Sequence, residues 1–166
     1  MRTIILIAHN LRSTYNVGSL LRTADGLGVQ RVYLTGYTPY PSAPQDTRLP
    51  HIAEKIDTQI HKTALDAETS VDWQHTDDVE PVIAALKRDG FTVAALEQSD
   101  TSVSLPKFMP PDKLALIVGR EVEGIEPEIL ARTDIILEIP MFGAKESFNV
   151  VQAAAIALYH ARFSAD

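Results

Sequence analysis

The stretch that decides the fold is TIILIAHNLRSTYNVGSLLRTADGLGVQRVYL, residues 3–34. Residues 3–8 form a continuous, isoleucine-rich apolar run, which predicts a strand covered on both faces. Over residues 17–27 the apolar side chains recur at helical spacing, and Gly28 follows as a C-terminal cap. Residues 30–34 predict a second strand. This strand–helix–strand order is typical of a parallel βαβ unit and therefore of an α/β fold.

The rest of the chain continues the alternation. The apolar patterns predict strands over residues 71–75, 91–96, 113–118 and 134–139, helices over 78–89 and 147–162, and a helical turn over 126–131. The segment from Tyr37 to Lys62 holds four of the ten prolines, and we expect it to be a long functional loop. We expect one domain over residues 1–166, with a mostly parallel sheet flanked by helices.

Composition excludes several classes of protein. The chain has 166 residues and no cysteine, which removes disulfide scaffolds, zinc ribbons, thiol nucleophiles and iron–sulfur ligation. No apolar run approaches 18 residues, and the start is too short for a signal peptide. We therefore expect a cytoplasmic protein without a membrane partner.

Charge is unevenly distributed along the chain, whose net charge is −7. Residues 1–62 carry seven lysines and arginines against four acidic residues, whereas the remainder carries eight against eighteen. The first part is thus locally basic. Two interpretations stay open: an ordinary solvated surface, or a face that binds a polyanion such as RNA.

The predicted final helix is apolar all the way round over residues 153–158. A helix on the surface of a domain keeps a polar face, so this helix needs a cover on the side away from the sheet. A partner subunit is one candidate, and a second layer of the same chain is the other.

Three segments place polar residues and glycines at the predicted carboxyl ends of strands, where α/β folds build their sites. They are residues 16–25, 119–125 and 139–150, whereas the common nucleotide-binding, hydrolase and metalloprotease motifs are absent. Each segment also has a purely structural interpretation. Asn16 and Ser147 are then helix caps, Arg22 is a solvated arginine, and residues 119–125 are an ordinary turn.

In this order, the three segments resemble the motifs of the SpoU/TrmH branch of the SPOUT methyltransferases. Residues 16–23 match the first motif, in which an asparagine precedes an arginine by six positions. Residues 119–124 match the second, G-x-E-x-x-G. Residues 139–150 match the third, I-P-M-x-G-x-x-x-S-L-N-V, except that Phe148 replaces the leucine and keeps apolar bulk where the family packs adenine.

The resemblance implies a ribose-2′-O-methyltransferase that uses S-adenosyl-L-methionine (AdoMet) and acts on tRNA or rRNA. S-adenosyl-L-homocysteine is the product and no metal is required. It also implies a deep C-terminal trefoil knot and a homodimer formed through the knot region and the final helix. Many relatives have an extra N-terminal RNA-binding domain, and we expect this chain to be a short form in which the catalytic dimer itself recognises RNA.

The motif positions imply the site residues. The catalytic set is Arg22, Asn16, Glu121, Ser147 and Asn149. Arg22 is central, and because arginine stays protonated we expect it to bind the neighbouring phosphate and stabilise the emerging alkoxide. We expect Glu121 to order Arg22 or the knot loops, and the two asparagines to orient the ribose or Arg22.

The ligand-binding residues follow from the same resemblance. We expect the AdoMet pocket to contain Leu96, Gly119, Ile139, Met141 and Phe148. RNA contacts are expected from Arg12, Arg22, Arg31, Arg48 and Lys62. In the proline-rich loop, Tyr37 and Tyr40 are candidates for stacking on bases. Residues 62–68 resemble a K-T-A-L-G-A-E stretch of short family members, with Asp66 in place of the glycine.

Two alternatives stay open. A non-catalytic RNA- or AdoMet-binding protein of the same knotted fold is the first, although it would be free to lose Arg22 and Glu121, which this chain has. An unknotted α/β enzyme acting on a small acidic metabolite is the second, and it leaves the three ordered motifs unexplained.

Overall fold

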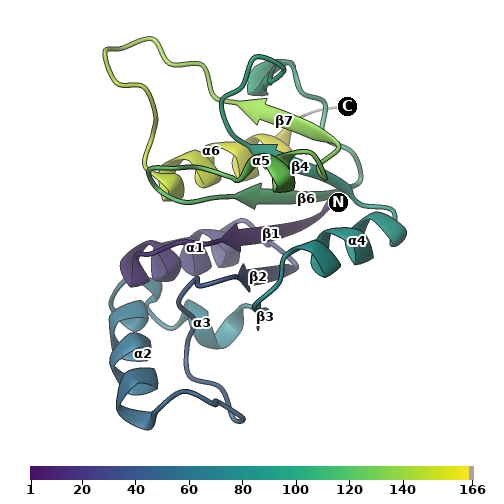
Figure 1. Ribbon diagram of the computed structural model, residues 1–166. Helices are drawn as coiled ribbons and strands as arrows, with labels where there is room; N and C mark the ends of the chain where they lie inside the picture. The colour runs from purple at the N-terminus through teal and green to yellow at the C-terminus, as the bar shows by residue number, and fades with distance from the viewer. Residues whose placement is uncertain (165–166) are drawn as a thin grey trace.

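Seven strands form one sheet in the computed structural model, which describes residues 1–164 (Figure 1). They are β1 (Thr3–His9), β2 (Arg31–Thr35), β3 (Trp73–Thr76), β4 (Thr92–Leu96), β5 (Val103–Ser104), β6 (Lys113–Val118) and β7 (Ile135–Glu138). Their order is β3-β2-β1-β6-β4-β7-β5, and all neighbouring pairs are parallel. In the centre of the sheet, Leu6 of β1 pairs with Val32 of β2 and Leu116 of β6. The carboxyl ends therefore meet at one edge, at the left of Figure 1.

Helices cover both faces of this sheet. The helices are α1 (Thr14–Gly26), α2 (Pro50–Ala64), α3 (Ala67–Ser70), α4 (Glu80–Arg88), α5 (Pro127–Leu130) and α6 (Val150–Phe163), with a 3₁₀ turn at Leu105–Lys107. One core joins α1, α6 and the C-terminal part of α2, with Ile60 and Ala64, to one face of the sheet. A second core joins α4 and α5 to the other face. The three-layer α/β architecture predicted from the sequence is thus confirmed.

The apolar run of β1 has a direct structural reason. Ile4, Leu6 and Ala8 point into the core under α1 and α6, whereas Ile5 and Ile7 point into the core under α4 and α5. A strand that is buried on both faces has no position for a polar side chain, so its sequence does not alternate.

Helix α2 overturns the prediction of a loop from Tyr37 to Lys62. Only the first half of that segment is irregular, and residues 50–64 form a helix that packs on α1. Pro50 stands in the first turn, where its missing N–H costs nothing. Gly18 of α1 permits the close contact, because a Cβ there would lie 2.2 Å from the Ile60 carbonyl oxygen of α2.

Helix α6 begins later than predicted. Its first residue is Val150 rather than Ser147, and Asn149 is the N-cap, with its side chain accepting a hydrogen bond from the Val151 amide. The sheet side of α6 buries Ala154, Ala157, Leu158 and Ala161.

The outer side of α6 is uncovered. Ile156 is 39% exposed, Tyr159 61% and Phe163 62%, so the alternative in which the same chain covers both sides is wrong for residues 1–164. Over that same range, no helix is both long and apolar enough to cross a membrane.

Candidate active site

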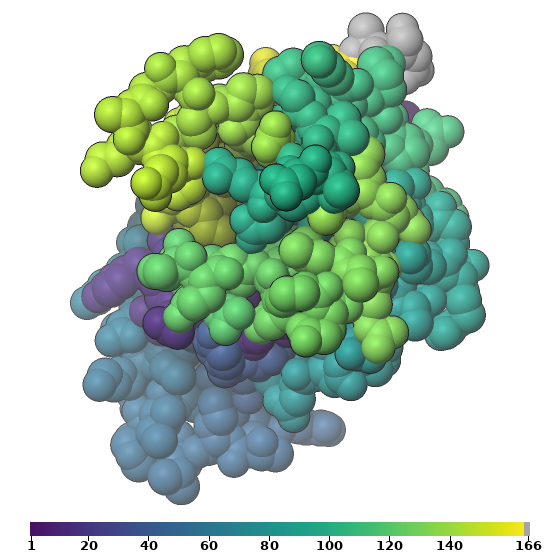
Figure 2. Space-filling view, turned by 45° about the horizontal axis from the view of Figure 1, so that its top comes forward, coloured from purple at the N-terminus to yellow at the C-terminus, as the bar shows by residue number. Residues whose placement is uncertain are grey.

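A pocket of about 290 Å³ opens at the carboxyl edge of the sheet, where β4, β6 and β7 end. Its walls come from residues 96–98, 118–124, 137–139, 141 and 146–148, and the start of α6 closes it. Figure 2 shows the hollow between the yellow-green segment that follows β7 and the teal segment that follows β4. Parallel sheets offer backbone groups at this edge, so it is the usual place for a ligand.

All five residues predicted to bind AdoMet lie on the wall of this pocket. They are Leu96, Gly119, Ile139, Met141 and Phe148. Glu121 and Ser147, from the predicted catalytic set, line it as well. The structure thus brings the second and third motifs together around one cavity, and the contacts of these residues with AdoMet stay a prediction.

The loop between β6 and α5 requires both of its glycines. A Cβ on Gly119 would lie 2.5 Å from Ile125 Cγ1 and 2.9 Å from the Gly124 carbonyl carbon. Gly124 has φ +71°, and a Cβ there would lie 2.1 Å from Glu97 Oε2. The chain folds back tightly between them, with the Gly124 amide donating to the Arg120 carbonyl oxygen at 3.2 Å. The interpretation of residues 119–125 as an ordinary turn does not account for these close approaches.

Glu97 fixes this loop from the side of β4, and sequence reasoning missed it. Its Oε2 accepts a hydrogen bond from the Ile125 amide at 3.0 Å, and its Oε1 accepts one from the Gln98 amide at 2.9 Å. The available signal was an acidic residue directly after a predicted strand. Its partner is 28 positions away in sequence, so the contact itself could not be predicted.

Glu121 links the pocket wall to the start of α1. It accepts hydrogen bonds from Asn16 Nδ2 at 3.0 Å, the Ser13 amide at 3.2 Å and the Arg12 amide at 3.3 Å. Partial burial acts to raise the pKa of the Glu121 carboxyl, but these hydrogen bonds outweigh it and hold the pKa below its ordinary value. The carboxylate is therefore the form that the structure stabilises at neutral pH.

The contacts of Asn16 and Glu121 bear on interpretations that the sequence left open. Asn16 is not a helix cap, because Ser13 is the N-cap of α1 and accepts a hydrogen bond from the Asn16 amide. Glu121 was expected to order Arg22 or the knot loops. Within one chain it makes no hydrogen bond or ion pair with Arg22, and every hydrogen bond it accepts from outside its own loop comes from residues 12–16. Asn16 and Glu121 thus act as a pair that joins the first motif to the second.

Arg22 lies apart from the pocket. It is exposed on α1 and absent from the pocket wall, and its side chain makes no hydrogen bond or ion pair with any residue from 1 to 164. Asn149 is exposed at the start of α6, beside the pocket-lining residues 146–148. Within one chain, the predicted catalytic set is therefore divided between the pocket and the surface of α1.

The residues predicted to bind RNA differ in their availability. Lys62 is exposed on α2. Arg12 is exposed and Arg31 is half-buried, and they pair with Glu123 and Asp72, each at 2.7 Å. Surface ion pairs of this kind are weak and exchange readily for a phosphate. These positions, with Arg22, stay predictions.

Arg48 and Tyr40 are occupied within their own loop. Arg48 donates hydrogen bonds to the Asp46 carboxylate and to the carbonyl oxygens of Tyr40 and Pro41. The hydrogen bond from Arg48 holds the pKa of Asp46 well below its ordinary value. The Tyr40 ring stacks on His75 at 3.9 Å, and the Arg48 guanidinium lies 3.6 Å from the same ring centre. Two groups this close cover opposite faces of the ring, so neither face of Tyr40 is free in this structure and Arg48 is already paired. Base stacking by Tyr40 and RNA contact by Arg48 would require these contacts to open, and both stay predictions.

One group of metal-ligand type is present in the described part of the chain, although the sequence suggested none. His61, Asp66 and Glu68 bring ligand atoms within 4.8 Å of one another at the junction of α2 and α3. The His61 ring already pairs with Glu68 at 2.6 Å, and none of the three lines the pocket. The group is therefore separate from the candidate active site.

A second hollow, of about 420 Å³, lies between residues 40–47 and β3. It is larger than the pocket at the carboxyl edge, but it contains none of the motif residues. Volume alone does not identify a site, whereas convergent polar groups and close backbone approach do. The smaller pocket is the better candidate.

An α/β protein with glycine-bearing loops around a pocket at the carboxyl edge belongs to the broad class that binds nucleotide-like ligands at that edge. The model of the SpoU rRNA Methylase family matches residues 3–159. The chain therefore belongs to this family, and the resemblance predicted from its three motifs is confirmed.

Individual relatives agree with this assignment. The chain is 29% identical to the tRNA (guanosine(18)-2′-O)-methyltransferase of Aquifex aeolicus, over 97% of this chain and 69% of that protein. It spans only 64% and 58% of two further curated relatives.

Solved structures agree as well. A structure described as giving insights into the 2-OH methylation of C/U34 on tRNA superposes with a TM-score of 0.75 at 26% identity, over 96% of this chain and 94% of the other. The SpoU methyltransferase AviRb of Streptomyces viridochromogenes, in complex with AdoMet, shares the fold with a TM-score of 0.78 at 19% identity, over 96% and 56% of the two chains.

Proposed function

We propose that this protein transfers a methyl group from AdoMet to the 2′-hydroxyl of a ribose in tRNA or rRNA. A carbon–oxygen bond forms at the ribose, the carbon–sulfur bond of AdoMet breaks, the hydroxyl proton leaves, and S-adenosyl-L-homocysteine is released. The observation that carries the proposal is the single pocket on which the second and third family motifs meet, with Glu121 and Ser147 on its wall.

The residues of the pocket fit AdoMet. Its volume lies near the lower end of the range for small-molecule sites, and Ile139, Met141 and Phe148 supply apolar surface of the kind that covers an adenine ring. Glu97 and Glu121 place negative charge on the same wall, which suits a sulfonium cation. When bound, AdoMet supplies the activated methyl group.

The chain's own residues then have separate tasks. Glu121 and Asn16 hold the wall of the pocket against the start of α1 through their 3.0 Å hydrogen bond. Arg22, which is exposed and has no partner among residues 1–164, is suited to bind a phosphate and to stabilise negative charge on the ribose oxygen. Ser147, on the pocket wall, and Asn149, two residues further on, are suited to orient the ribose.

The proposal includes a homodimer and a knotted C-terminal half. Arg22 lies outside the pocket of its own chain, so we place it at the pocket of a partner subunit. The exposed apolar face of α6, formed by Ile156, Tyr159 and Phe163, supports such a contact. Support for the knot is the family assignment, together with the way the segments after β6 and β7 line one cavity.

The test uses methyl-labelled AdoMet, total RNA and nucleoside mass spectrometry after nuclease digestion. We expect a labelled 2′-O-methylnucleoside from the wild type. Arg22→Ala should lower the rate about 10²–10⁴-fold and keep the rise in Tm that AdoMet produces. Arg88→Ala, which removes an exposed arginine from the end of α4, is the matched control and should retain activity.

Two outcomes would contradict the proposal. AdoMet binding without label in any RNA would favour the non-catalytic RNA- or AdoMet-binding protein. If AdoMet far above micromolar concentration produced no rise in Tm, the protein would not bind AdoMet and the proposed reaction would be contradicted.

A further inference from the structure

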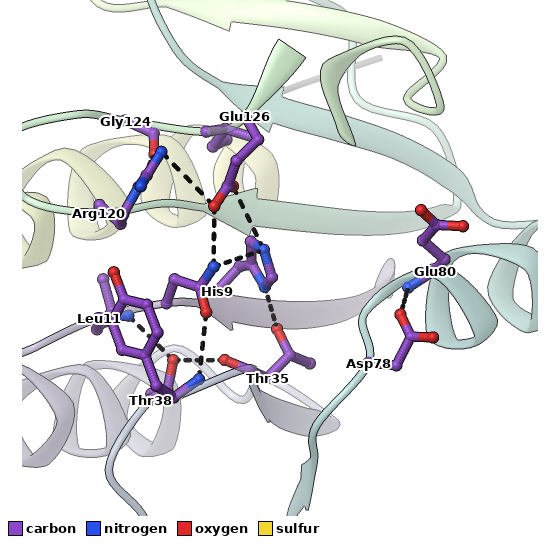
Figure 3. Close-up of polar contacts among 12 residues, drawn as sticks. His9, Leu11, Thr35, Thr38, Asp78, Glu80, Arg120, Gly124 and Glu126 are labelled. Atoms are coloured by element: carbon purple, nitrogen blue, oxygen red, sulfur yellow. Dashed lines mark hydrogen bonds and ion pairs between the residues drawn. The ribbon is translucent and has the colours of Figure 1, made fainter. Parts of the chain in front are cut away.

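A buried polar cluster lies behind the pocket wall, where β1 ends beside β6 (Figure 3). His9, Thr35 and Thr38 are buried, and Glu126 and Arg120 reach them from the β6 side. None of these residues except Arg120 lines the pocket, and the three family motifs leave His9, Asn10 and Glu126 without a role. Buried polar groups are costly unless they are bonded, so the cluster requires an explanation.

Asn10 is the centre of this cluster. Its backbone is left-handed, with φ 57°, a conformation that asparagine tolerates better than other side chains. Its amide donates to the Thr35 carbonyl oxygen at 3.1 Å, and its Oδ1 accepts from the Tyr37 amide at 3.1 Å. Gly36 leaves room for this side chain, since a Cβ there would lie 1.9 Å from Asn10 Oδ1. Two loops are therefore shaped around one asparagine.

The side-chain nitrogen of Asn10 reaches the β6 side. It donates to Glu126 Oε1 at 2.9 Å and lies 3.1 Å from His9 Nε2. Because the Tyr37 amide fixes Oδ1, both hydrogens of Nδ2 are directed to these two acceptors. His9 Nε2 is then unprotonated, and its Nδ1 donates to Thr35 Oγ1 at 2.9 Å. The result is one connected network in which Glu126 Oε2, 3.4 Å from His9 Nε2, has no hydrogen-bond partner among residues 1–164.

The charges in the cluster agree with a neutral His9. Burial lowers the pKa of His9 and Arg120 adds to this, whereas Glu126 and Asp78 act in the opposite direction. Burial also acts to raise the pKa of Glu126, but hydrogen bonds to its carboxylate, including the one from Asn10, bring it below the ordinary value. Glu126 is thus the charged member, and Arg120 Nη2 lies 3.6 Å from its Oε1.

We propose that Asn10 and Glu126, supported by His9, form a clamp that fixes the position of α1 relative to the pocket wall, and that both act as positioning residues for methyl transfer. Glu126 follows the wall loop 119–125 directly, and Asn10 directly precedes the segment that leads into α1. The clamp lies at one end of this junction, and Glu121 with Asn16 lies at the other. Two attachments prevent a rotation that either one alone would permit.

The inference rests on the proposed function, because it assigns Asn10 and Glu126 to the geometry of that reaction. Arg22 is carried by α1, and the pocket is formed by the loop 119–124. In the proposed dimer Arg22 acts at the partner subunit's pocket, so a shift of α1 against this loop within each chain changes the distance between Arg22 and the pocket across the interface. A displacement of about 1 Å between reacting groups lowers a rate by roughly 10²-fold. Loss of the clamp should therefore slow transfer while the pocket still binds AdoMet.

The test compares Asn10→Gly, Glu126→Ala and Glu126→Gln. Glycine accepts the left-handed backbone of residue 10 without strain, so Asn10→Gly removes the side-chain bonds and leaves the fold. Glu126→Gln keeps an acceptor for Asn10. Glu128→Ala, an exposed carboxylate two residues further on, is the matched control.

We expect Asn10→Gly and Glu126→Ala to lower the single-turnover rate about 10–100-fold with a Kd for AdoMet near that of the wild type. Glu126→Gln and Glu128→Ala should transfer at close to the wild-type rate. Amide hydrogen exchange should speed up in residues 10–13 and 119–125 in the two slow variants only.

Several results would overturn the clamp. Wild-type rates in Asn10→Gly and Glu126→Ala remove the positioning role, and so does a loss matched by an equal loss of AdoMet affinity and Tm. Unchanged exchange in both segments removes the clamp itself. A wild-type protein that methylates no RNA contradicts the proposed function and the positioning role together, whereas the exchange measurement, which needs no turnover, still decides whether the clamp exists.

Discussion

Two loops line the same pocket but are held very differently. The loop of residues 119–126 is tied to β4 by Glu97 and to the start of α1 by Glu121 and Glu126. By contrast, among residues 1–164 a single hydrogen bond, from Gln98 Nε2 to the Glu146 carbonyl oxygen, joins residues 140–148 to the rest. Figure 2 shows this second segment standing away from the body of the protein.

This difference indicates that one chain alone fixes the first loop, residues 119–126, but not the second loop, residues 140–148. The first loop is fixed by hydrogen bonds within one chain, although Val122 is 87% exposed, whereas the second is almost unattached and leaves Phe142 99% exposed and Phe148 40% exposed. Apolar side chains left at the rim of a pocket gain most from a ligand or a second copy of the chain. We therefore expect binding of AdoMet, RNA or the partner subunit to restrict the motion of the second loop more than that of the first.

The largest expected effect comes from exchanging one glycine in each loop. Gly124→Ala introduces a Cβ 2.1 Å from Glu97 Oε2 at φ +71°, so we expect it to lower the free energy of unfolding by about 3 kcal/mol. Gly143→Ala meets nothing within 4 Å and should change it by less than about 1 kcal/mol. Urea denaturation measures both, and equal effects would contradict the contrast between the loops.

Removing the carboxylate that holds the first loop should have the next largest effect. Glu97→Ala leaves the amides of Ile125 and Gln98 without their acceptor and should cost about 2 kcal/mol. Glu97→Gln keeps one acceptor and should recover part of this. The matched variant in the second loop is Glu146→Ala, whose exposed side chain bonds nothing in residues 1–164, and we expect no measurable change.

The end of the second loop offers a smaller and more specific test. Asn149→Ala removes the cap of α6 and should destabilise the fold by about 1 kcal/mol, whereas Asn149→Ser retains a capping oxygen. Thermal denaturation and the methyl-transfer rate together separate two roles. If Asn149→Ser has wild-type stability but a low transfer rate, the predicted contact of Asn149 with the ribose is supported. If both stability and transfer rate are at the wild-type level, Asn149 acts only as the cap of α6.

The smallest effect is a dependence on pH. Hydrogen bonds hold the pKa of Glu121 below its ordinary value of 4.5, despite burial. Its contribution to stability is therefore fully present above pH 4.5 and is lost as the pH falls through the lowered value. Glu121→Gln should flatten the decline of Tm on acidification, and an unchanged slope in this variant would show that Glu121 does not stabilise the first loop.

The sequence predicted the elements whose cause is local. The apolar run of β1 and the spacing of α1 follow from burial on each face, and both were found. Helix α2 could not be predicted in this way, because four prolines close together indicate a loop, whereas the last of them, Pro50, stands in the first turn of a helix. The start of α6 was misplaced because Ser147 and Asn149 are equally good caps by type.

The site residues show the same division between what local sequence predicts and what depends on distant contacts. The family motifs predict that Gly119, Met141 and Phe148 share one pocket, and the structure places all three on its wall. The roles of Glu97 and Asn10 could not be predicted, because their partners lie 28 and 116 positions away in sequence and neither residue belongs to a motif. The covering of the Tyr40 ring by Arg48 and His75 could not be predicted either, because both contacts depend on the folded loop and on β3.

The central claim is that AdoMet binds between the two loops and restricts the motion of the second more than that of the first. Amide hydrogen exchange with and without AdoMet tests this directly. We predict strong new protection over residues 140–148 and a small change over residues 119–124. No change in either loop, or protection confined to the hollow between residues 40–47 and β3, would contradict the account.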